Sequence, residues 1–147
     1  MRTDRLSKHE YFFKICSVVA ERSTCRKRQV GAIIVKNGMI ISTGYNGAAK
    51  GSVDCLTSGC LRDNSDSGTD LLSCRASHAE MNAIVQAAAN GANITDADMY
   101  TSTMPCDLCL KLIINSGIKR VFYLEDYKNH LLLDELKNLI ELNKIVL

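Results

Sequence analysis

Two short motifs constrain this chain more than any other feature: His78-Ala79-Glu80, and residues 105–109, which contain Cys106 and Cys109. One imidazole and two thiolates make a three-ligand zinc site that leaves the fourth tetrahedral position for water, whereas a structural zinc site normally closes all four positions. Glu80, two residues after the histidine, is then free to act on that water. The chain must therefore fold so that these two motifs meet at one point.

A Cys-x-x-Cys pair alone would suit a redox motif or half of a zinc ribbon equally well. Neither of these requires a matching His-x-Glu motif, so the pairing favours a catalytic zinc. Ser77 is a suitable N-cap for an alanine-rich helix over residues 79–89, and Pro105 suits the first turn of a helix that follows over residues 108–114. Two helix N-termini would then face the metal, and their dipoles favour thiolates there.

Length and composition fit a single domain over residues 1–147, because 46% of the residues are hydrophobic and can form a substantial core. The net charge of +2 gives no large electrostatic footprint for nucleic acid or an anionic membrane. The first ten residues are charged rather than signal-like, and no apolar run is long enough to span a bilayer. We expect a soluble cytoplasmic protein, in the host cytoplasm if the source is viral.

Periodicity predicts most of the secondary structure. A helical stripe covers residues 7–21, where Cys16 is expected to be a buried apolar residue rather than a ligand. Two β-rich runs, 30–35 and 39–43, flank Asn37-Gly38 and predict a hairpin. Strands over 99–102 and 119–124 enclose the second helix of the motif pair, so they should be parallel. An amphipathic helix is predicted over 131–142. This order predicts an α/β fold, a three-layer α/β/α sandwich with a mixed sheet of four to five strands.

The remaining cysteines concentrate around a long polar segment, residues 48–75, that has no periodicity of its own. Loops of this length are usually functional or disordered, and a second metal would order this one. Cytosolic disulfides are rare, so metal binding is the better account of so many cysteines. Four of these cysteines could act together: Cys25, Cys55, Cys60 and Cys74. They could form a closed four-thiolate structural zinc site, or they could be free thiols in a mobile loop, and both interpretations stay open.

Together these residues resemble the deoxycytidylate (dCMP) deaminase family within the cytidine deaminase-like fold. Paired His-x-Glu and Pro-Cys-x-x-Cys motifs are the signature of zinc-dependent deaminases in general. The Gly-Tyr-Asn-Gly turn and the cysteine-bearing insertion indicate the nucleotide branch. The resemblance covers nearly the whole chain, through residues 29–32, 44–47, 78–84, 105–109 and 116–119.

The resemblance implies hydrolytic deamination of dCMP to dUMP and ammonia, which supplies dUMP for dTMP synthesis. It implies that Asn46 hydrogen-bonds the deoxyribose and that the amide of Ala79 meets the pyrimidine carbonyl. It also implies a homo-hexamer that is activated by dCTP and inhibited by dTTP, with Mg²⁺, at an effector site that involves Gly44, Tyr45, Asn46 and Gly47. This chain has Ala49 where the family commonly has proline. Some relatives hold a second zinc with mixed cysteine and histidine ligands, and the cysteines here fit an all-thiolate variant.

The expected chemistry uses Glu80 to carry protons between water, N3 of cytosine and the leaving amino group. Arg26 and Arg28 are candidates for the phosphate because a guanidinium fork matches phosphate oxygens, although a solvated surface role suits each equally well.

Rival functions remain: a bifunctional dCMP/dCTP deaminase, a nucleoside or base deaminase, a nucleic-acid editing enzyme, or a non-catalytic competence-type or scaffold protein. Near-neutral charge and the absence of tryptophan disfavour editing. The intact metal motif disfavours a scaffold.

Overall fold

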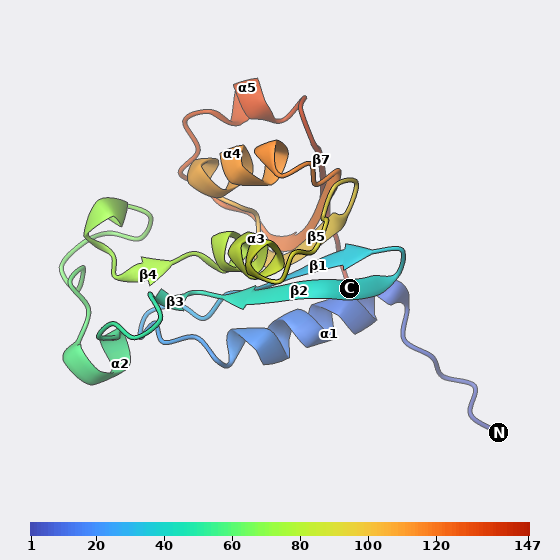
Figure 1. Ribbon diagram of the computed structural model, residues 1–147, viewed down its shortest axis with the longest axis horizontal. Coiled ribbons are helices and arrows are strands. Elements are labelled where there is room, and N and C mark those ends of the chain that lie inside the picture. Colours follow the sequence, from blue (N-terminus) through green and yellow to red (C-terminus); the bar gives the residue numbers. More distant parts are fainter.

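The computed structural model of the chain describes residues 1–147 (Figure 1). Five strands form one mixed sheet in the order β2-β1-β5-β6-β7, and β3 and β4 form a separate two-stranded ribbon. No helix combines the length and the apolar character that a membrane crossing requires. The helices are α1 (Lys8–Ala20), α2 (Cys55–Ser58), α3 (Ala79–Ala89), α4 (Asp107–Asn115) and α5 (Leu133–Leu136), with a 3-10 turn at Leu71–Ser73. The strands are β1 (Gly31–Lys36), β2 (Met39–Tyr45), β3 (Gly47–Ala48), β4 (Ala76–Ser77), β5 (Asp98–Thr103), β6 (Arg120–Glu125) and β7 (Glu141–Lys144).

Helices cover both faces of the sheet, with α1 on one side and α3 and α4 on the other (Figure 1). Successive residues of one strand point to opposite faces. Accordingly Ile33 of β1 packs with α1, whereas the neighbouring Ile34 packs in the larger core with α3 and α4. Cys16 of α1 is buried and its thiol donates to the carbonyl of Tyr100 (3.3 Å), as expected of a core residue. The predicted three-layer α/β/α sandwich is confirmed.

The order of strand pairing follows from the connections. A two-residue turn at Asn37 and Gly38, both with positive φ, joins β1 and β2 as the predicted antiparallel hairpin. β1 also pairs with β5 in antiparallel fashion, and β5, β6 and β7 run parallel. Because α4 connects β5 to β6, the carboxyl ends of these two strands lie at the same edge of the sheet.

The C-terminal segment corrects one prediction. The helix expected over residues 131–142 is a single turn, α5, and the chain then forms strand β7. The many leucines of this segment fit a helical and a strand pattern alike. Pairing with β6 satisfies the backbone groups of an otherwise unpaired strand edge, while Ile140 and Leu142 cover the core. Backbone pairing with β6 and burial against the core therefore favour a strand over a helix in this segment.

A close approach at Gly44 fixes α3 on the sheet. A Cβ atom at Gly44 would lie 2.3 Å from the carbonyl oxygen of Ala79 and 2.3 Å from the amide nitrogen of Ala83, so only glycine allows this contact. Side chains on either side secure it: Ser42 Oγ donates to the carbonyl of Ala83 (2.6 Å), and Asn82 Nδ2 donates to the carbonyl of Tyr45 (2.7 Å). The N-terminus of α3 is therefore held rigidly against β2.

Candidate active site and metal centre

The metal motifs meet at two helix N-termini. His78 is the N-cap of α3, and Cys106 is the N-cap of α4 with Cys109 in the first turn. The sequence predicted the start of each helix too early. Ser77 belongs to the short strand β4, and Pro105 precedes the cap instead of lying in the first turn. The prospective ligands themselves thus occupy positions where a helix dipole favours negative charge.

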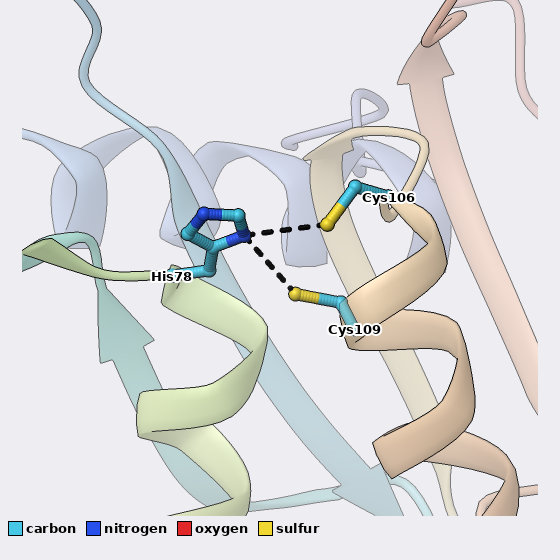
Figure 2. Close-up of side chains that lie close together, drawn as sticks. All are labelled: His78, Cys106 and Cys109. Atoms are coloured by element: carbon cyan, nitrogen blue, oxygen red, sulfur yellow. Dashed lines mark hydrogen bonds between the residues drawn. The ribbon is translucent and has the colours of Figure 1, made fainter. Parts of the chain in front are cut away.

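The three side chains converge as a tetrahedral metal site requires (Figure 2). The Nδ1 atom of His78 lies 3.4 Å from Sγ of Cys106 and 3.3 Å from Sγ of Cys109. Metal–ligand distances of about 2.0 Å for nitrogen and 2.3 Å for sulfur in tetrahedral geometry imply an N···S separation of about 3.5 Å. The observed spacing fits zinc. These residues form the one group of three or more candidate ligands whose ligand atoms all lie within 4.8 Å of one another.

Glu80 reaches the same point from the first turn of α3. It is only 5% exposed, and Sγ of Cys109 donates to its Oε2 atom (3.5 Å). Burial raises the pKa of the Glu80 carboxyl above its usual range. A carboxyl group with a raised pKa beside three metal ligands is suited to accept and return a proton.

The two thiols and the imidazole of this group shift one another's pKa values. A hydrogen bond from Cys109 and the contact with His78 outweigh the effect of burial and together lower the pKa of Cys106 to about 4. The pKa of Cys109 is raised, first because it is the donor of that hydrogen bond and then because it is buried. The hydrogen bond to Cys106 raises the pKa of His78. The lowered pKa favours the thiolate form of Cys106, and metal binding would release the protons held by the ligands.

Asp107, between the two cysteines, anchors the start of α4. Its carboxylate accepts hydrogen bonds from Nδ1 of His130 (2.6 Å) and from the amides of Leu131 (2.7 Å) and Leu132 (3.0 Å). Burial alone raises the pKa of Asp107, but these hydrogen bonds outweigh it and the net pKa is lowered. The imidazole of His130 packs edge-on against the ring of Tyr127. This clamp joins α4 to the loop that follows β6, and no motif or periodicity predicted it.

A cavity of about 330 Å³ opens over the metal residues. This lies within the range of about 300–1,000 Å³ that is usual for small-molecule sites. Three cationic side chains line the cavity: those of Lys27, Arg28 and Arg62. Of these, only Arg28 was expected from the sequence to contact the phosphate. Arg26 is exposed and is not part of the wall. Sequence reasoning missed Tyr127, although its place just after the carboxyl end of a parallel strand is a known position for binding residues. The principal lining residues are Lys27, Arg28, Asn46, Arg62, His78, Ala79, Glu80, Thr103, Cys106 and Tyr127.

Asn46 lines the cavity while holding the backbone of the preceding loop. Its Oδ1 accepts from the amide of Val30 (2.9 Å) and its Nδ2 donates to the carbonyl of Arg28 (2.8 Å). One amide hydrogen of Asn46 remains for a ligand.

Ala79 stands at the first position of α3, where a backbone N–H has no partner within the helix. The other residues of the turn lie further from the cavity: Gly44 is buried under α3 and Gly47 is buried in the β3–β4 ribbon.

The four remaining cysteines that the sequence grouped together line one wall of the cavity. Burial raises the pKa of the Cys55 thiol, and the charges of Cys60, Cys25 and Cys74 raise it further, so the four groups lie close enough to interact. They do not form a second set with all ligand atoms within 4.8 Å. All seven cysteines are free thiols in the structure.

The fold and donor set define an α/β domain with a His/Cys/Cys group suited to zinc and a buried carboxyl group beside it. Residues 6–125 match the family model described as the cytidine and deoxycytidylate deaminase zinc-binding region. The chain belongs to this cytidine and deoxycytidylate deaminase family. It is 42% identical over 127 residues to the ComE operon protein 2 of Bacillus subtilis, covering 86% of this chain, and 37% identical over 124 residues to the deoxycytidylate deaminase of Saccharomyces cerevisiae, covering 84%.

A similar structure is that of the dCMP deaminase from cyanophage S-TIM5, in complex with dCMP and dUMP. It has a TM-score of 0.78 and 30% identity, covering 92% of this chain and 95% of that one. These two curated relatives are longer: the chain spans 64% of the length of the Bacillus protein and 39% of the yeast enzyme.

Proposed function

We propose that this protein hydrolyses dCMP to dUMP and ammonia. The observation that carries the proposal is the buried carboxyl group of Glu80 beside a His/Cys/Cys set, at the base of a cavity lined by cations. Membership of the deaminase family supports the reaction type, and the dCMP deaminase of the cyanophage supports the substrate. The product dUMP is the precursor from which a thymidylate-forming reaction would start.

Each step is assigned to residues of this chain. His78, Cys106 and Cys109 would hold a zinc ion, which would supply the Lewis acidity that makes water nucleophilic near neutral pH. Glu80 accepts a proton from the attacking water and delivers it to N3 of the cytosine ring. The water oxygen bonds to C4, and the second proton of that water passes from the new hydroxyl group through Glu80 to the exocyclic nitrogen. The C4–N bond then breaks to release ammonia and leave the C4 carbonyl of dUMP.

The substrate contacts follow the cavity wall. The Ala79 amide binds the pyrimidine carbonyl, and the free amide hydrogen of Asn46 binds the deoxyribose. Arg28 and Arg26 are the phosphate contacts that the sequence suggested. Arg28 supports this role by its position in the wall, where its Nη2 donates to Thr103 Oγ1 (2.6 Å). Arg26 would have to move toward the cavity to take part.

Ammonia release from dCMP, dCTP, cytidine and a cytosine-containing oligonucleotide tests the proposal directly. We expect turnover of dCMP and none of the oligonucleotide. Turnover of dCTP as well would indicate the bifunctional dCMP/dCTP enzyme, which the number of cations in the wall favours as the second candidate. No release from any substrate by zinc-loaded protein would favour a non-catalytic role, as the operon-derived name of the Bacillus relative leaves open.

We also propose a second, structural zinc held by Cys25, Cys55, Cys60 and Cys74. Their shared wall and electrostatic interaction support it, and four thiolates suit a closed zinc site. Elemental analysis should find about two zinc ions per chain. One ion per chain in protein prepared without chelators would refute the second site.

Regulation and assembly are proposed from the family alone. The protein forms a homo-hexamer in the cytoplasm, activated by dCTP and inhibited by dTTP with Mg²⁺, through the turn of residues 44–47. Light scattering tests the hexamer, and rates with and without each nucleotide test the regulation. Ala49 is exposed just after this turn, at the position where the family commonly has proline. We therefore expect the effector response to differ from that of the family more than the other properties do.

A further inference from the structure

The three cations in the cavity wall differ in how far their hydrogen-bonding capacity is used. The guanidinium of Arg28 is bound to Thr103 and lies 3.5 Å from Glu125. The ammonium of Lys27 donates to the carbonyl oxygen of Arg62. Arg62 itself has a buried Nε with no partner, and its Nη2 makes only a long contact to the carbonyl of Asp66 (3.5 Å).

An unpartnered buried guanidinium nitrogen is costly, because the group loses water without gaining a protein acceptor. A ligand with several anionic oxygens would remove this cost. Arg62 and Arg28 also both lower the pKa of Tyr127, against the larger effect of its burial, so the two guanidinium groups act on the same part of the cavity. Asp66 also lines the cavity, and its negative charge limits the attraction for anions.

We propose that Arg62 is the residue that selects nucleotides over nucleosides, by binding the 5′-phosphate group with its unused guanidinium donors. This inference rests on the proposed function. It adds a phosphate contact from the polar segment of residues 48–75, which the motifs of the catalytic centre do not include, to the contact proposed for Arg28.

The surroundings of Arg62 hold its backbone in place for this role. Its amide donates to Sγ of Cys60 (3.4 Å), and its carbonyl accepts from Lys27. The contact with Cys60 therefore holds the backbone at the position from which the Arg62 side chain reaches the cavity.

The test compares Arg62→Gln and Arg62→Lys with wild type, using dCMP and deoxycytidine as paired substrates. Loss of a charge-assisted hydrogen bond to phosphate should lower kcat/KM for dCMP by about 10- to 100-fold, mainly through KM. Activity on deoxycytidine should change by less than about twofold, which also shows that the variant is folded. Arg62→Lys should retain part of the dCMP preference because it keeps the charge.

Thermal stabilisation by dCMP and by inorganic phosphate provides a readout that does not depend on turnover. Arg62→Gln should lose most of both shifts. Arg22→Gln, an exposed arginine outside the cavity, is the matched control and should lose neither. Equal loss of activity on dCMP and deoxycytidine, or unchanged phosphate binding in Arg62→Gln, would overturn the proposal. If wild type binds dCMP but releases no ammonia, the proposed function fails, and these binding shifts still decide the role of Arg62.

Discussion

The carboxyl group of Glu80 is buried where packing alone would favour an apolar side chain. Glu80→Gln keeps the shape of the side chain but removes its ability to carry a proton, so we expect turnover of dCMP to fall by about 100-fold or more. Zinc content and the unfolding midpoint should stay close to wild type, because His78, Cys106 and Cys109 are unchanged. Stopped assays for ammonia, with metal analysis of the same sample, measure both. Near-normal turnover in this variant would contradict the role given to Glu80.

Asp107 is expected to act through the cysteines beside it. In Asp107→Asn, an amide NH₂ replaces one acceptor oxygen and meets the N–H donors of His130 or the following backbone. We expect a loss of about 1–3 kcal/mol in the free energy of unfolding and a weaker hold on zinc. Urea denaturation and competition with a chromogenic chelator measure these effects.

Asp134→Asn is the matched control for Asp107→Asn, since Asp134 is 94% exposed and pairs only with Lys137. It should change neither stability nor zinc affinity. Wild-type zinc affinity and stability in Asp107→Asn would show that the clamp between α4 and the loop after β6 has no positioning role.

Residues with fixed chemical partners were predictable from sequence, and residues placed by tertiary contacts were not. His78, Glu80, Cys106 and Cys109 stand in short motifs whose spacing reflects a single metal. Arg62 and His130 belong to segments without periodicity. Their positions depend on contacts with residues far along the chain, such as Lys27 and Asp107.

At the scale of elements, the contact between β2 and α3 depends on Gly44. In Gly44→Ala the new methyl group would meet backbone atoms of α3 at 2.3 Å, and backbone cannot rotate aside as a side chain can. We expect a loss of about 3 kcal/mol or more in stability. Turnover should fall as well, because α3 carries His78 and Glu80. Urea unfolding and dCMP kinetics on the same preparation would test both effects.

Gly38→Ala separates this steric effect from a purely conformational one. Nothing lies within 4 Å of a Cβ at Gly38, but its φ of +75° is unfavourable for alanine. The expected cost is about 1–2 kcal/mol, with kinetics unchanged. Similar stability losses in the two variants would show that α3 adjusts easily to the methyl group.

Local signals determined which elements the sequence could predict. The capping box of Ser7 and Glu10, the Asn37-Gly38 turn and the stop at Gly91 each act within a few residues, and the elements they bound were predicted correctly. Residues 137–144 carry no such signal. Their strand forms because the edge of β6 is available, which is a property of the assembled sheet.

For the molecule as a whole, the two proposed zinc ions should have separable effects. Cys109→Ser removes a ligand of the catalytic centre, whereas Cys55→Ser removes a ligand of the proposed cysteine site. Each variant should retain about one zinc per chain instead of two. Cys109→Ser should lose turnover but keep residues 48–75 resistant to limited proteolysis, because the cysteine site that orders them is intact.

Cys55→Ser should show the opposite behaviour. Without its metal, the segment of residues 48–75 has few buried apolar side chains to hold it, so proteolytic cleavage should concentrate there. This loss of order should displace Arg62 from the cavity and weaken its contact with the phosphate. The KM of the variant for dCMP should therefore be higher than that of wild type, while turnover of deoxycytidine persists. If cleavage and zinc content in Cys55→Ser match wild type, the four cysteines are free thiols, and hydrogen bonds alone keep this wall of the cavity in place.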